Sequence, residues 1–66
     1  MKLHIDKKSD ALYLRLDDSS IIESQEVSPG VVLDFNKDNQ VVDIEMLNLS
    51  QRTSQLNLDE LQYQTA

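Results

Sequence analysis

The sequence predicts an α+β domain, in which an antiparallel β-meander of four to five strands, built from two hairpins, precedes a short C-terminal helix. Three observations predict this fold. Apolar and polar residues alternate in several short segments, as they do in strands that bury one face. Two pairs of these segments flank polar, turn-forming clusters. After Leu47 the alternation stops and Gln, Asn and Leu dominate.

Residues 29–47 contain the clearer hairpin. Two apolar segments rich in β-branched residues flank the polar cluster 36–39, which suits a four-residue loop. Such a loop gathers the apolar side chains on one face and leaves a mostly acidic set on the other. The apolar set is Val31, Leu33, Phe35, Val42, Ile44 and Met46, and the other face carries Val32, Asp34, Val41, Asp43 and Glu45.

Residues 2–6 and 11–16 alternate in the same way around the polar turn 7–10. A four-residue loop there places Leu3 opposite Leu14 and Ile5 opposite Leu12, which predicts a second hairpin with one apolar face. Residues 21–27 alternate less cleanly and carry charges, so we expect an edge strand. Pro29, with its fixed backbone angle, ends this strand and turns the chain into the clearer hairpin.

The chain is predicted to form one domain, with residues 1–50 as the sheet and residues 51–66 as a C-terminal arm. Asn57 followed by Glu60 has the spacing of a capping box, and Leu58 and Leu61 would lie on one helical face. The arm is predicted either to be a short helix that closes the apolar face of the sheet or to become ordered on a partner. The helix would cover Leu3, Ile5, Leu12, Leu14, Val31, Leu33, Phe35, Val42 and Ile44.

Length limits how much core the chain can bury. A domain of 66 residues without cysteine has no disulfide or thiolate metal site to support its small core. Apolar residues also remain outside the predicted core, so we expect a homodimer when the natural partner is absent. They are Val32, Val41 and Leu47 on the outer face of the clearer hairpin, and Ile21 or Ile22 at its edge.

The charge is acidic and unevenly distributed. Twelve acidic residues stand against six Lys and Arg, and after Arg15 ten acids face only Lys37 and Arg52. Such a surface repels nucleic acid and favours a basic protein partner. No apolar run exceeds three residues, so neither a membrane span nor a secretory signal is expected, and the cytoplasm is the expected compartment.

Residue chemistry points away from catalysis. His4 is the only histidine, no cysteine is present, and no glycine-rich phosphate loop occurs. We therefore expect neither an enzyme nor a cofactor. A weak metal motif does occur, because Asp34, Asn36, Asp38 and Glu45 match the oxygen spacing of a calcium loop. Its context argues against calcium, since strand sequences stand where the flanking helices should be.

Three blocks of sequence resemble the small prokaryotic domain of unknown function 2283. The blocks begin at residues 10, 26 and 41 and read DALYL, EVSPGVVLDF and VVDIEMLNLS. They are similar to the family's patterns D-x-L-Y-[IL], E-x-x-x-G-[VI]-x-x-D-[FLY] and v-V-G-I-E-[IL]-L-x-A-S, over residues 3 to about 50. The chain departs from them at Asn39 and Asp43, where the family has glycine, and at Leu49, where it has alanine.

The resemblance implies little about activity. Members of the family are often encoded beside a second small family that resembles RNA-cleaving toxins, which implies an antitoxin-like or partner-binding role. Two hypotheses follow. In the first, the chain is a protein-interaction module that neutralises a basic, RNase-like partner, with contacts at Asp34, Asp43, Glu45, Leu58 and Leu61. In the alternative, it is a stand-alone homodimer that binds a small ligand or metal through the acidic face of the clearer hairpin, residues 29–47.

Overall fold

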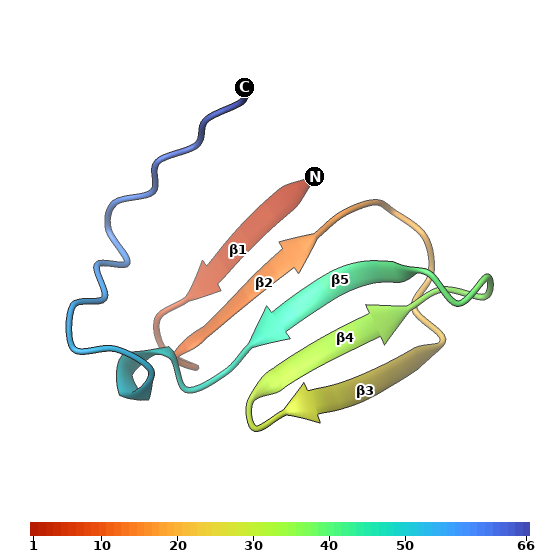
Figure 1. Cartoon of the computed structure of the whole chain (residues 1–66), viewed down its shortest axis with the longest axis horizontal. Helices are drawn as coiled ribbons and strands as arrows, with labels where there is room; N and C mark the ends of the chain where they lie inside the picture. The colour runs from red at the N-terminus through yellow and green to blue at the C-terminus, as the bar shows by residue number, and fades with distance from the viewer.

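The computed structural model describes all 66 residues and shows a five-stranded antiparallel sheet (Figure 1). The strand order across the sheet is β1-β2-β5-β4-β3. The elements are β1 (Lys2–Asp6), β2 (Ala11–Arg15), β3 (Glu23–Ser28), β4 (Val31–Phe35), β5 (Val41–Met46) and the 3-10 turn η1 (Leu49–Gln51). The predicted antiparallel sheet of two hairpins is therefore confirmed.

β1 and β2 pair in the predicted register. Leu3 lies opposite Leu14 and Ile5 opposite Leu12, so these apolar side chains share one face. The turn between the strands ends at Asp10, which has a positive φ of 55°. Asp is one of the few residues that adopt this left-handed conformation at low cost, because its short polar side chain can hydrogen-bond locally.

β4 and β5 form the other hairpin, with the predicted faces but a longer loop. Leu33 lies opposite Ile44, as the apolar face requires. The loop is closed by the Asn36 N–H, which donates to the Gln40 carbonyl at 3.0 Å. A β-bulge beside the loop, where the register shifts, absorbs the odd residue, so the two faces keep their predicted identities.

The prediction of a simple meander is wrong, because β2 pairs with β5 and not with β3. In this arrangement Leu14 lies opposite Ile44, so the apolar face runs without interruption from one hairpin into the other. The polar strand β3, all six of whose residues are exposed, takes the outer edge beside β4. Pairing β2 with β3 instead would have set an apolar strand beside one that has no apolar face.

The predicted C-terminal helix, and with it the α+β class, is also wrong: the domain is mostly β, and η1 is its only helical turn. Asn57 does not cap a helix. Its Oδ1 accepts a hydrogen bond from the backbone N–H of Asp59 at 3.0 Å, which closes a local turn instead. A helix this short is marginal without tertiary contacts. The structure contains no helix with the length and hydrophobicity needed to cross a membrane.

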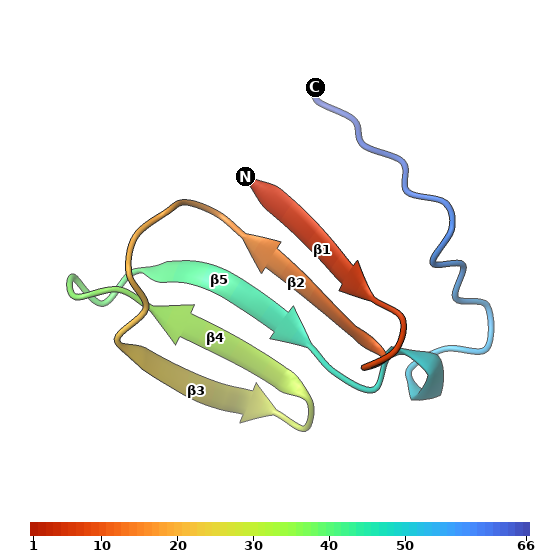
Figure 2. The same cartoon turned by 180° about the vertical axis from the view of Figure 1, so that it is seen from behind.

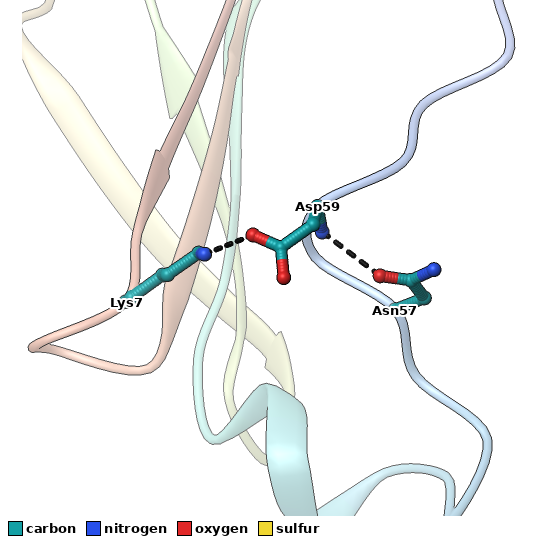
Figure 3. A network of polar contacts seen from close by, with 3 residues as sticks. All are labelled: Lys7, Asn57 and Asp59. Atoms are coloured by element: carbon teal, nitrogen blue, oxygen red, sulfur yellow. Dashed lines mark hydrogen bonds and ion pairs between the residues drawn. The ribbon is translucent and has the colours of Figure 1, made fainter.

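Several contacts attach the segment after β5 to the turn between β1 and β2, and one of them is a hydrogen bond from the Leu49 N–H to the Asp10 carbonyl at 3.0 Å. The carboxylate of Asp10 accepts hydrogen bonds from the backbone N–H of Ser50 at 3.0 Å and from its Oγ at 2.7 Å. Further along, Lys7 Nζ forms an exposed ion pair with Asp59 (Figure 3). The tail beyond η1 then runs outside β1 and crosses neither face of the sheet (Figures 1 and 2).

As a result, the apolar face that the helix was expected to cover is open. Only Ala11, Val42 and Leu49 are buried apolar residues, and Val42 alone among them belongs to the predicted core. The other predicted core residues are partly exposed. We define the open face by the partly exposed residues Leu3, Ile5, Leu12, Leu14, Val31, Leu33, Phe35, Ile44 and Met46.

Candidate functional site: an acidic cluster on the sheet

Three acidic side chains from the two central strands converge on the face opposite the open face. Asp34 of β4 lies directly across from Asp43 of β5, and Glu45 is two residues further along β5, on the same side. A carboxylate oxygen of each lies within 4.8 Å of the others. We call Asp34, Asp43 and Glu45 the acidic cluster.

Neighbouring strands contribute the residues around the cluster. Ser24 of β3 lies opposite Asp34, and its Oγ donates a hydrogen bond to Asp34 Oδ1. Arg15 of β2 lies opposite Asp43, but its guanidinium donates to the backbone carbonyls of Asp17, at 2.6 Å, and Ser19. The arginine is therefore held by the loop after β2 and makes no ion pair with the cluster.

The cluster is poorly solvated. Asp34 is only 2 % exposed, and Oδ1 of Asp43 is buried without a hydrogen-bond partner. Burial, followed by the negative charge of Asp34, raises the pKa of Asp43, and the charge of Arg15 only partly opposes this. A hydrogen bond with Asp34, then burial and the charges of both aspartates, raise the pKa of Glu45 to about 7.

Three like charges in so small a volume repel one another strongly, so they are not all ionised at neutral pH. The cluster therefore retains a proton, and the raised pKa of Glu45 makes this residue the one that takes it up as the pH falls to about 7. Carboxylate oxygens that converge in this way can share a proton or bind a hard cation. Asp34, Asp43 and Glu45 are the residues whose oxygens lie close enough together to hold such a cation.

The calcium-loop set identified in the sequence is not assembled as a unit. Asp34 and Glu45 come together, but Oδ1 of Asn36 already accepts from the backbone N–H groups of Asp38 and Gln40, both at 3.0 Å. Asn36 therefore shapes the hairpin loop, and Asp38 is exposed within that loop. The third carboxylate of the cluster comes instead from residue 43.

The residues predicted to contact a partner lie in two separate places. Asp34, Asp43 and Glu45 sit together in the cluster, turned toward one another and largely withdrawn from water. Leu58 is partly buried and Leu61 is 65 % exposed, and both belong to the tail outside β1. One continuous surface made of both groups is therefore not formed by this chain.

Sequence reasoning assigned no role to Ser24 or Arg15. Ser24 lies in the weakly alternating edge segment, where neither face is cleanly apolar, so its orientation could not be read. Arg15 could be placed opposite Lys2 in the first hairpin, but its second neighbour depends on the pairing of β2 with β5. In the same hairpin His4 pairs with Tyr13, and their ring centroids lie 5.9 Å apart.

Comparison with known proteins gives one match. A family model described as "Protein of unknown function (DUF2283)" matches residues 2–50 of the 66-residue chain. No curated protein and no solved structure matches the chain. The matched region contains all five strands, the acidic cluster and the open face.

Proposed function

The chain belongs to the DUF2283 family of proteins of unknown function, and from this premise we propose that it is a protein-interaction module that works through its open face. The observation that carries the proposal is the lack of a covering layer. A sheet with one apolar face is stable when that face packs against another element. Here the tail passes outside β1 and leaves the face uncovered (Figures 1 and 2).

The tail approaches the open face without closing it. Leu61 and Tyr63 line a shallow apolar hollow together with Leu3, Leu12 and Leu14, yet Leu61 is 65 % and Tyr63 77 % exposed. The centre of the face, around Ile44 of β5, lies farther across the sheet than this hollow. The apolar surface at the centre is thus free to bind another chain, and binding rather than catalysis is the role we propose.

The proposal is tested with a charged substitution at the centre of the open face. In cells that naturally contain the protein, Ile44→Lys should dissociate the complex that the wild-type chain forms. The readout is the mass of the particle that contains the tagged chain, measured in a non-denaturing cell extract. Glu60→Lys, in the exposed tail, is the matched control and should leave the complex intact. Circular dichroism checks that both variants fold. An Ile44→Lys variant that stays in the same complex would overturn the proposal.

The acidic residues that remain exposed favour a second contact, an electrostatic one with a basic protein. The family resemblance implies a basic, RNase-like partner, and net charge −6 would steer a basic protein toward the chain. The acidic cluster is an unsuitable contact because its carboxylates face one another. The exposed acids around β3 and the preceding loop are better placed, and they are Asp17, Asp18, Glu23 and Glu26.

Charge reversal tests this second contact. Changing Glu23 and Glu26 to Lys should slow the association of a basic partner and reduce its salt dependence, because long-range attraction would be lost. Changing Asp59 and Glu60 to Lys, in the exposed tail, makes the same change in net charge at a different place. If both double variants slow association equally, net charge alone is responsible and no contact surface around β3 exists.

A further inference from the structure

The surface area indicates how much of this chain remains to be covered. The chain exposes 5250 Å². A folded monomer of 7.6 kDa is expected to expose about 4,300 Å². The partly exposed open face and the exposed tail both contribute to this excess of roughly 1,000 Å². It is large enough for one protein interface of ordinary size, in which each partner buries ~800 Å².

The charge distribution restricts what that surface can be. The residues of the open face are all uncharged, while the acidic cluster lies on the opposite face. A basic partner would find no complementary charge on the open face. An uncharged apolar surface fits best, and a second copy of the chain provides one of the same size and shape.

We infer that the open face is covered by the open face of a second copy of this chain, which gives a two-layer β-sandwich dimer with both acidic clusters on its outside. This inference rests on the proposed function and names the first partner. Face-to-face sheets pack about 10 Å apart, with their strands at about −30°. In both views the tail stays outside β1, and the connection between β2 and β3 crosses the β4–β5 hairpin only at its loop end (Figures 1 and 2).

The proposed interface differs from the patches that the sequence suggested. Those patches included Val32, which shares its face with the acidic cluster, because Val32 pairs with Glu45. A dimer formed through that face would bring two acidic clusters together. A dimer formed through the open face keeps them apart across the full thickness of the sandwich, a distance that physiological salt largely screens.

The charge arrangement also predicts how the dimer responds to salt. Each copy carries a net charge of −6, so the copies repel one another at long range while their apolar faces attract at contact. Added salt screens the repulsion, and the dimer should become tighter. A complex with a basic partner responds in the opposite way, because salt weakens its attraction.

Mass and thiol labelling of the purified chain test the inference. The wild-type mass should be twice 7.6 kDa at high concentration, fall on dilution and increase with salt. Because the chain has no cysteine, Ile44→Cys and Glu26→Cys each introduce one reporter, the first on the open face and the second at an exposed edge. Between about 1 and 100 μM, labelling at position 44 should slow about tenfold as the dimer forms, whereas position 26 should react at a constant rate.

The other outcomes are distinct. A chain that remains monomeric over this range overturns the inference, as does a dimer in which position 44 reacts at the same rate at every concentration. If the purified chain is monomeric but Ile44→Lys still dissolves a complex with a different protein in cells, the second copy is excluded and the proposed function stands. If Ile44→Lys changes neither mass nor complex, both fail.

Discussion

Asp34 and Asp43 face each other across the central pair of strands, so two acidic residues occupy one cross-strand position. Like charges directly opposite in a sheet are destabilising. Ser24 stabilises Asp34 by a hydrogen bond, but Asp43 retains a buried oxygen without a partner. A hydrogen bond with Asp34, burial and the charges of both aspartates raise the pKa of neighbouring Glu45 to about 7, so the cluster loses part of its negative charge below that pH.

Stability should therefore fall as the pH rises from about 4.5 to above 7. The pKa of Glu45 increases from 4.5 in the unfolded chain to about 7 in the fold, so the folded state binds more protons in this window and loses that advantage as the proton leaves. The raised pKa of Asp43 acts in the same direction. The lowered pKa values of Asp6 and Asp17 matter only in more acidic solution.

Thermal melts at pH 5 and pH 8, at one protein concentration, check this prediction. The melting temperature should be several degrees lower at pH 8, since about 1 kcal/mol moves it by roughly 4–8 °C in a domain of this size. Glu45→Gln should reduce the difference, whereas Glu60→Gln in the exposed tail should not. A Glu45→Gln protein with the same pH dependence as wild type would show that the cluster holds no proton at that residue.

Gly30 should not tolerate a side chain. Its φ is +75°, which costs a non-glycine residue about 1–2 kcal/mol. A Cβ there would also collide with Nη2 of Arg52. This nitrogen donates a hydrogen bond to the Pro29 carbonyl at 2.7 Å, and Nε of Arg52 donates one to the Leu47 carbonyl at 2.8 Å. Gly30→Ala should therefore lower the free energy of unfolding through both effects.

A double-mutant cycle with Arg52→Ala separates the two contributions, with unfolding in urea as the measurement. In the Arg52→Ala background, Gly30→Ala should lower the free energy of unfolding only by the cost of placing a non-glycine residue at a positive φ. An equal loss in both backgrounds would mean that Arg52 is not seated over Gly30 in solution.

The bond between Asp10 and Ser50 should contribute measurably to stability, because it attaches the turn after β1 to η1. Asp10→Asn keeps a residue that tolerates positive φ but loses the charge, and Ser50→Ala loses the hydroxyl donor. Each should cost about 1 kcal/mol in urea unfolding. Together they should cost less than the sum, because both weaken the same interaction: Asn keeps an acceptor oxygen but not the charge.

Ser54→Ala is the control for this pair, since Ser54 lies in the exposed tail. Fully additive losses for Asp10→Asn and Ser50→Ala would contradict the bond.

Leu33→Ala should have a cost that depends on protein concentration. Leu33 lies at the centre of the open face and is only partly buried within one chain. When a second copy covers it, truncation should cost about 2–5 kcal/mol, as in a core. At high dilution the cost should shrink, because the face is then open. Val32→Ala, on the opposite face, should cost the same at all concentrations, and equal behaviour of both variants would argue against a covered face.

Local patterns determined much of this fold. Alternation of Leu3 and Ile5 with polar neighbours was enough to predict the register of the first hairpin, since a slip by one residue would turn these side chains to the other face. In the second hairpin, parity predicted the faces despite an incorrect loop length. Turn chemistry acts over a few residues, and so Pro29 and Gly30 were placed correctly between two strands.

Tertiary structure decided the rest, because it depends on residues distant in the sequence. β2 can pair with the free edge of either β3 or β5. The alternation of apolar and polar residues within each strand does not show which of the two pairings is more stable. The helix in the tail required a surface to dock on, and without one the local turn at Asn57 prevailed. The acidic face was visible in the sequence as Asp34, Asp43 and Glu45. Its chemistry was not, because a carboxyl pKa is set by burial and by neighbours such as Arg15 that only the folded sheet brings near.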